Sequence, residues 1–238
     1  LNQLTATEGG ISEPQTKYEW DGDHRLMAVE TAHSRTTFMY DGFGRRVGIR
    51  ELVEGTEVAK KNFIWCGDEI CEERTSSGEA VRRFFPQGVS VELGPNKGRY
   101  YYTKDHLGSI RELVDESGKV RAQYAYDPYG VRSRISGDLE ADFGFAGYFF
   151  HQQSGLYLTL MRGYDRLNAR WLSRDPIEEY HSPNLYQYCA NNPVNRIDPL
   201  GTISFSVSFW SGVTGGVKAL EVGNAVATTY AVGTASAL

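Results

Sequence analysis

Residues 38–49 read FMYDGFGRRVGI: two aromatic residues one position apart, then Asp, a glycine-containing stretch, and a basic and apolar return. Phe38 and Tyr40 fall on one face of a strand, because side chains alternate across a strand with a period of two. Asp41 and the glycines after it favour a turn, and the residues beyond them alternate again. This stretch therefore predicts a β-hairpin.

The same phrase recurs along the chain. It reads YEWDGDHRLMAV from Tyr18 and YAYDPYGVRSRI from Tyr124, with looser copies from Asn62 (NFIWCGDEICEE) and Arg99 (RYYYTKDHLGSIRELV). One hairpin cannot bury its aromatic face, but stacked neighbours can. Helical periodicity is weak before residue 201, so we predict an all-β fold of stacked antiparallel hairpins. The aromatic residues expected on its interior face are Tyr18, Trp20, Phe38, Tyr40, Tyr124 and Tyr126.

Composition bounds the function. The 238 residues are 40% hydrophobic and 13% aromatic, which is enough to build a core. The net charge of -5, with Lys and Arg dispersed, argues against a nucleic-acid partner. The chain contains no uninterrupted apolar run of membrane-spanning length. It begins LNQLTATEGG, without the features of a signal peptide, and we expect a piece of a longer protein.

Cysteine and histidine give no sign of a metal site. Cys66 and Cys71 are five residues apart with no His or further Cys nearby to complete a zinc site, and Cys189 is distant. We expect semi-buried thiols. The five histidines make no i, i+4 pair. We expect no metal and no cofactor, and no motif of a turnover enzyme is present.

The sequence DPLG at residues 198–201 has two interpretations. It fits a type I turn, with Asp at the first position, Pro at the second and Gly at the fourth. DPYG at residues 127–130 fits that turn equally well. The chemical interpretation needs a second carboxylate, and Asp175 also precedes a proline, 23 residues before Asp198. Two carboxylates held close cannot both ionise, so one can act as an acid while the other activates water.

Composition changes abruptly after Gly201. The last 37 residues hold only two charged residues, Lys218 and Glu221, and no proline. TISFSVSF, at residues 202–209, alternates strictly and predicts a half-buried strand. The rest is small and apolar, without His, Asp or Arg. We interpret it as the stub of a longer or truncated effector packed against the fold; a membrane-active peptide is the alternative.

These phrases resemble the YD repeats of Rhs and teneurin-type proteins. Residues 100–201 resemble the Rhs repeat-associated core domain, because DHLGS, DPYG, GLY, WLSRDP, NLYQY, NNPVN and DPLG occur in the order typical of that family. The resemblance implies YD-repeat hairpins over 1–99, the core over 100–201 and a variable tail over 202–238. It also implies a β-sheet shell around a toxic C-terminal effector, plugged at one end by the core. Short helical turns are expected only in this plug, near RLNARWLSRDP (166–176) and NLYQYCANNP (184–193).

The resemblance also implies a chemical role. Asp175 and Asp198 match the self-cleaving aspartates of the family, and Arg174 lies beside the first of them. Arg174 would tune the pair or orient a carbonyl, or else join a plain surface ion pair. The implied cut falls once, between Thr202 and Ile203, so that the chain is at most a single-turnover aspartyl autoprotease.

The segment RGYDRLNAR, residues 162–170, departs from the family pattern. Gly163, Arg166 and Ala169 replace an aromatic residue, a proline and a glycine, and Thr202 stands where the family usually has Leu. Glycine accepts a positive φ at little cost and alanine does not. This predicts an altered or strained turn near Ala169.

The resemblance implies several partners. They are the upstream YD-repeat shell of the same polypeptide, the enclosed effector, secretion-spike proteins and an immunity protein, with secretion or surface display after cytoplasmic synthesis. The alternative is a YD-repeat cell-surface or adhesion protein that presents a sticky β surface and is not cleaved. A degenerate array that has lost its effector is a third interpretation.

Overall fold

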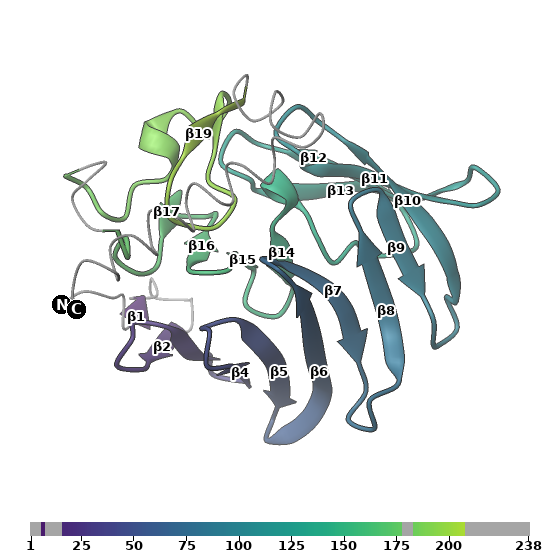
Figure 1. The fold of residues 1–238 in the computed structure, drawn as a ribbon, viewed down its shortest axis with the longest axis horizontal. Coiled ribbons are helices and arrows are strands. Elements are labelled where there is room, and N and C mark those ends of the chain that lie inside the picture. The colour runs from purple at the N-terminus through teal and green to yellow at the C-terminus, as the bar shows by residue number, and fades with distance from the viewer. Residues whose placement is uncertain (1–5, 8–15, 178–182, 208–238) are drawn as a thin grey trace, which may run out of the picture.

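The computed structural model describes residues 6–7, 16–177 and 183–207, and they form the all-β fold that the repeats predict. Thirteen antiparallel strands make one sheet, in which the order of the strands is their order in the sequence (Figure 1). The strands are β1 (Ala6–Thr7), β2 (Thr16–Trp20), β3 (Leu26–Glu30), β4 (Ser34–Tyr40), β5 (Arg46–Val53), β6 (Thr56–Cys66), β7 (Glu69–Arg74), β8 (Ala80–Phe85), β9 (Gly88–Val91), β10 (Gly98–Lys104), β11 (Ile110–Asp115), β12 (Val120–Tyr126) and β13 (Arg132–Gly137).

One carboxylate contact closes five of the turns in this sheet. Asp41 Oδ1 accepts the backbone N–H of Phe43 at 2.9 Å and that of Arg45 at 3.0 Å. These donors lie two and four positions after the aspartate, and the contact satisfies N–H groups that the turn would otherwise leave unpaired. The aspartates that make this pair of contacts are Asp21, Asp41, Asp105, Asp115 and Asp127.

The aromatic residues that open each unit line the inner face of the sheet, as predicted. The first aromatic of a unit is buried, and the second is half-buried against the same core. In three units the second aromatic also joins its unit to the preceding one, because its polar atom donates a hydrogen bond to a backbone carbonyl there. The three such bonds run from Tyr40 to Leu26 (2.9 Å), from Trp65 to Arg46 (2.8 Å) and from Tyr126 to Ile110 (2.8 Å).

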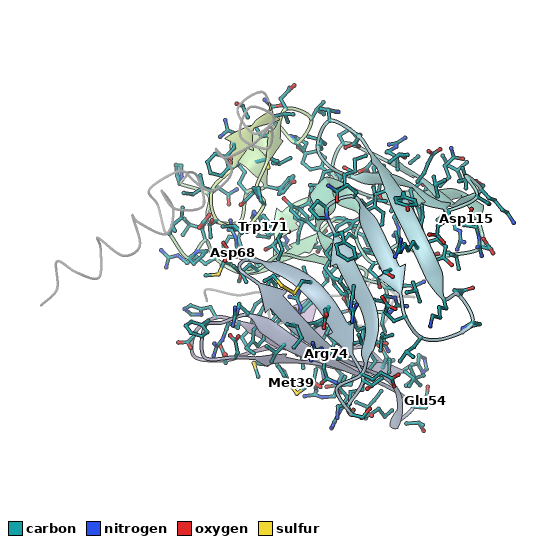
Figure 2. All side chains as sticks on the ribbon, turned by 45° about the vertical axis from the view of Figure 1, so that its right-hand side comes forward. Met39, Glu54, Asp68, Arg74, Asp115 and Trp171 are labelled. Carbon is teal, nitrogen blue, oxygen red and sulfur yellow. A yellow bond between two sulfur atoms is a disulfide. The ribbon has the colours of Figure 1, made fainter. Side chains whose placement is uncertain are left out.

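The large sheet curves around a four-stranded sheet, which we call the plug (Figure 1). Its strands are β14 (Phe149–His151), β15 (Leu156–Leu158), β16 (Gly163–Asp165) and β17 (Arg170–Trp171). Phe63 of the large sheet meets Phe149 of the plug edge to face at 5.4 Å, and Glu51 Oε1 lies 2.9 Å from His151 Nε2. Figure 2 shows Trp171 inside the molecule and Met39 and Glu54 at its periphery.

A second aromatic core lies under the plug, around Tyr148, Tyr157, Tyr164, Trp171 and Tyr188. Beside it β18 (Arg196–Ile197) pairs with β19 (Phe205–Ser206), which forms part of the strand expected over 202–209; residues 208 and 209 lie outside the described residues. Among the described residues, no helix has the length and hydropathy needed to span a membrane.

The helical turns follow the prediction in one of two places. A 3₁₀ turn at Cys189–Asn191 lies within NLYQYCANNP, as predicted. RLNARWLSRDP instead forms a hairpin turn and β17, because the carboxylate of Asp165 closes that turn. A further 3₁₀ turn, at Phe145–Gly147, was not expected. The large sheet passes residue 100 without a break, and the division at residues 99 and 201 stays a prediction from sequence.

The expectation of free thiols at Cys66 and Cys71 is wrong. The two residues form a disulfide across the β6–β7 hairpin, with 5.7 Å between their Cα atoms. Spacing in sequence does not reveal this pairing, because it depends on which residues the hairpin places opposite one another. Cys189 is free and buried.

We expect Tyr126→Phe to lower the free energy of unfolding by about 1–2 kcal/mol, because the carbonyl of buried Ile110 loses its donor. Tyr126→Ala should cost about 3–5 kcal/mol, since the packed ring is also lost. Denaturant unfolding measures both. Tyr101→Phe, at an exposed tyrosine, is the control and should leave stability unchanged. Equal stability of Tyr126→Phe and the wild type would contradict the assigned role of the hydroxyl.

Alkylation of the unfolded, unreduced protein should label one thiol, that of Cys189, and prior reduction should raise the number to three. Mass spectrometry counts the labels. Reduction should also lower the free energy of unfolding by about 2 kcal/mol, as expected for a cross-link closing a short loop. Three labels without reduction would show that the disulfide does not form.

Candidate functional site

The DPLG sequence forms the turn that its residues predict. Gly201 donates its N–H to the Asp198 carbonyl at 3.3 Å, and Thr202 donates its N–H to Asp198 Oδ1 at 2.7 Å. Gly201 has a φ of +77°, and a Cβ there would collide with the Thr159 hydroxyl and crowd the backbone of Arg162. Only glycine fits this position, so the chain is held tightly against the 159–162 segment. We call this boundary after Gly201, where the composition changes, the seam.

Arg162 brings the two predicted aspartates together. Its Nη2 atom lies 2.9 Å from Asp175 Oδ2 and 3.2 Å from Asp198 Oδ2. The side chains of Arg162 and Asp198 are 2% and 3% exposed, and that of Asp175 is 15% exposed. The pair predicted from sequence therefore exists as two carboxylates that share one buried cation.

The other nitrogens of Arg162 are used as well. Nε donates to the Gly201 carbonyl at 2.6 Å and Nη1 donates to the Leu185 carbonyl at 3.2 Å. The guanidinium lies over the ring of Trp171, 4.4 Å from its centre. The arginine is thus fixed on three sides and can hold its partners in one geometry.

Burial makes Asp198 a weaker acid than an exposed aspartate. Loss of solvent raises its pKa to about 6, against the opposing effects of the Arg162 charge and the Thr202 N–H, while the charge of Asp175 raises it further. The Tyr148 hydroxyl contacts the backbone of Asp198 on both sides, donating to its carbonyl at 2.8 Å and accepting its N–H at 3.3 Å. At mildly acidic pH this carboxyl holds a proton next to the backbone of the seam.

The DPYG turn at residues 127–130 lacks these features. Asp127 is exposed, and its Oδ1 accepts the N–H groups of Tyr129 and Val131 as in the other turns of the sheet. In the described part of the chain, no arginine is bonded to it. Burial and the shared arginine, not the motif, distinguish Asp198 from Asp127.

Arg174 does not join the pair. Within residues 6–7, 16–177 and 183–207, no hydrogen bond or ion pair links it to Asp175 or Asp198, and its buried Nε has no acceptor. Sequence reasoning missed Arg162, although this residue opens the RGYDRLNAR segment. Two signals could have pointed to it: its position at the start of that segment and the need of a buried carboxylate pair for a cation.

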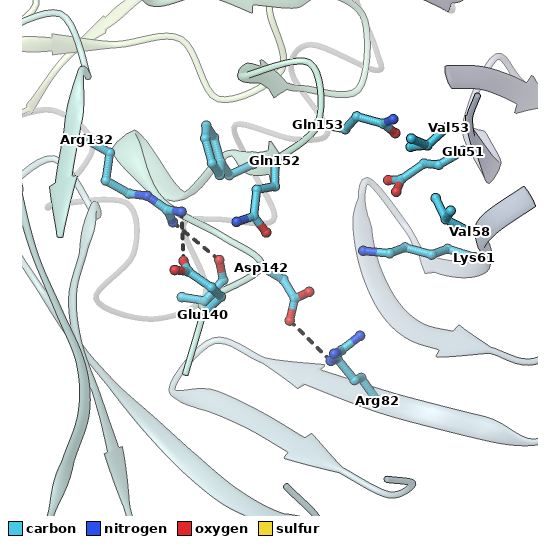
Figure 3. Close-up of a pocket in the computed structure, with 12 residues that line it drawn as sticks. Glu51, Val53, Val58, Lys61, Arg82, Arg132, Glu140, Asp142, Gln152 and Gln153 are labelled. Carbon is cyan, nitrogen blue, oxygen red and sulfur yellow. Dashed lines mark hydrogen bonds and ion pairs between the residues drawn. The ribbon is translucent and has the colours of Figure 1, made fainter. Parts of the chain in front are cut away.

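A hollow of about 380 Å³, apart from the aspartate pair, lies between the large sheet and the plug (Figure 3). Its charged side chains are largely matched: Arg132 pairs with Glu140 at 2.9 Å and Arg82 with Asp142 at 3.5 Å. No group of His, Cys, Asp and Glu in the described ranges could hold a metal ion. The hollow is therefore a charge-balanced part of the interface between sheet and plug.

A family model described as Teneurin YD-shell matches residues 90–194. The probable deoxyribonuclease RhsB of Dickeya dadantii is 29% identical over 197 residues, and the match covers 78% of this chain and 13% of that protein. Together with the repeats and the fold, these matches support an Rhs or YD-repeat shell protein.

One further relative and one solved structure are also similar to this chain. The tRNA3(Ser)-specific nuclease WapA of Bacillus spizizenii is 29% identical over 204 residues, covering 80% of this chain and 8% of that protein. The crystal structure of TcdB2-TccC3-TEV shares the fold, with a TM-score of 0.62 at 20% identity over 78% of this chain and 10% of that one. The chain spans about a tenth of the length of these relatives.

The hairpin turn forms despite the departures from the Rhs pattern at residues 163 and 169. Ala169 adopts a φ of +54°, the left-handed conformation that glycine would take more easily. Asp165 still closes the turn by accepting the N–H groups of Leu167 and Asn168. Gly163 is buried, with Leu172 close to the position that a Cβ would take. The expected strain is thus confined to one residue of the hairpin that carries Arg162.

We expect Ala169→Gly to raise the free energy of unfolding by about 1 kcal/mol, because it removes the cost of a left-handed alanine. Thermal or denaturant unfolding measures the change. Ala125→Gly, within strand β12, is the matched control and should lower stability by about 0.5–1 kcal/mol. The same sign for both substitutions would show that residue 169 is not strained.

Proposed function

We propose that this chain is the closing segment of an Rhs-type β-shell, that the shell encloses a C-terminal effector, and that Asp175 and Asp198 cut the chain once at the seam. The fold and the family support a role in a shell. The single observation that carries the proposed cleavage is the burial of Asp198 beside Asp175 on one guanidinium. A turn that served only the scaffold would need neither feature, as Asp127 illustrates.

The proposed step is the hydrolysis of one peptide bond. Asp175, the more exposed of the pair, takes a proton from a water molecule as its oxygen adds to the Thr202 carbonyl carbon. The bond between Thr202 and Ile203 then breaks as protonated Asp198 gives its proton to the Ile203 nitrogen. One carboxyl group loses a proton and the other gains one, so the pair keeps a single proton throughout.

The relatives of the chain support the proposal that the shell encloses an effector. WapA and RhsB are named as nucleases, which fits shells that carry a toxic effector, and this chain matches only a small share of each. The upstream shell of the same polypeptide and the enclosed effector would be its partners, with secretion-spike proteins and an immunity protein as further ones. Delivery to the cell surface or outside the cell would follow.

Intact mass of the purified wild-type chain should show a cut after the DPLG turn, and Asp175→Asn and Asp198→Asn should each leave the chain whole. Asparagine can still cap the turn, so the fold should persist in both variants. Asp127→Asn is the matched control and should be cut at the wild-type rate. Cleavage should fade as pH rises through about 6, because Asp198 then loses the proton that it must donate.

An uncut wild-type chain from mildly acidic to neutral pH would reject self-cleavage and favour an uncleaved surface or adhesion protein. Cleavage that persists in Asp198→Asn would remove Asp198 from the mechanism. Because the cut at Thr202–Ile203 rests on family resemblance, the fragment masses also test which bond breaks.

A further inference from the structure

We propose that Arg46 holds a small monovalent anion, of the chemical class of chloride, between the large sheet and the plug. Arg46 opens β5, and its side chain reaches the segment that joins β15 to β16. The inference is carried by a buried cation without a carboxylate partner and by a small cavity beside it. It does not depend on the proposed self-cleavage.

The guanidinium of Arg46 is buried with most of its donors unused. The residue is 3% exposed, and its Nη1 donates to the Thr159 carbonyl at 3.4 Å. Within residues 6–7, 16–177 and 183–207, Nε and Nη2 have no acceptor and no carboxylate forms an ion pair with the side chain. Buried charges are almost always paired in proteins, because taking an ion out of water without a counter-charge is costly. Arg46 therefore needs a negative partner from outside the described side chains.

Other arginines of the chain do not share this property. The other buried arginine among the described residues, Arg162, contacts the carboxylates of Asp175 and Asp198. Three further arginines leave one nitrogen without an acceptor, but in each it is only Nε and the residue is half-buried. Arg46 combines full burial, two unused nitrogens and an unpaired charge.

The surroundings of Arg46 add positive charge. Arg46 and Lys61 each lie over the ring of Phe149, 5.8 Å from its centre. Burial lowers the pKa of the neighbouring His151, and the charges of Lys61 and Arg46 lower it further, against the opposing effect of Glu51. The Glu51 carboxylate is already engaged, with its Oε1 atom 2.9 Å from His151 Nε2. Two cations and one carboxylate leave a positive excess that favours a negative ligand.

A cavity limits the size of this ligand. It measures about 10 Å³, which is room for one water-sized particle and too little for phosphate or sulfate. Of the described residues that line it, none is acidic, and they come from both the large sheet and the plug; they include Trp20, Leu26, Tyr40, Arg46, Leu158 and Thr159. A water molecule could accept the free N–H groups but would leave the charge unbalanced. A chloride ion is only slightly larger than water and does both.

The test is the thermal unfolding of the full chain at constant ionic strength, with chloride exchanged for gluconate, a monovalent anion that is too large for the cavity. A ligand that binds only the folded state stabilises it, so raising chloride from about 1 mM to about 300 mM should raise the Tm of the wild type by about 3 °C or more. Arg46→Met should abolish this dependence. Arg132→Met is the matched control and should keep it, because Arg132 lies at the same interface but has Glu140 as its partner.

A second measurement needs no variant and decides the question if Arg46→Met does not fold. In crystals of the wild type grown in bromide, anomalous scattering should place a bromide ion beside Nε and Nη2 of Arg46. Water in place of bromide at this position, or a wild-type Tm that does not respond to chloride, would overturn the inference. An equal response of Arg46→Met and Arg132→Met to chloride would overturn it as well. None of these results bears on cleavage at the seam, which is tested separately by the aspartate variants.

Discussion

The structure depends on one contact, an aspartate carboxylate that accepts backbone N–H groups in the turn that follows it. A reversal of the chain leaves backbone donors without a partner in the sheet, and each intramolecular hydrogen bond to such a donor contributes about 0.5–1.5 kcal/mol. Asp41 accepts two of these bonds in the turn of its hairpin, and four other aspartates of the sheet do the same. The repeat can therefore reverse direction many times with little demand on the other turn residues.

The candidate site is a modified form of this scaffold turn. Asp198 accepts the N–H four positions on, as Asp41 does, but its second oxygen reaches Arg162 in the interior. Burial supplies what the exposed turns lack, a carboxyl group whose pKa of about 6 lets it hold a proton near neutral pH. A change of environment, with no change of motif, separates a structural aspartate from a candidate catalytic one.

The local pattern predicted the hairpins well because their determinants are local: paired aromatic residues, an aspartate and a glycine within a dozen positions. Asp175 and Asp198 could be found because both stand before prolines and match a family pattern. Arg162 opens the RGYDRLNAR segment, but that position does not show which residues it binds, since its partners lie 13 and 36 residues further along the chain and meet only when the plug packs. The Cys66–Cys71 pairing and the 3₁₀ turn at Phe145–Gly147 likewise depend on contacts that sequence spacing does not show.

The order of the strands has a consequence for biosynthesis. Each strand of the large sheet pairs with its sequence neighbours, so every hairpin can form as soon as its second strand has been made, with little loop-closure entropy to overcome. The plug is synthesised after the large sheet, and the turn at Asp198 follows the plug and contacts segments made before it, at Met161 and Arg162. Because Asp198 is synthesised after every strand of the large sheet, the carboxylate pair can form only when all thirteen strands have been made.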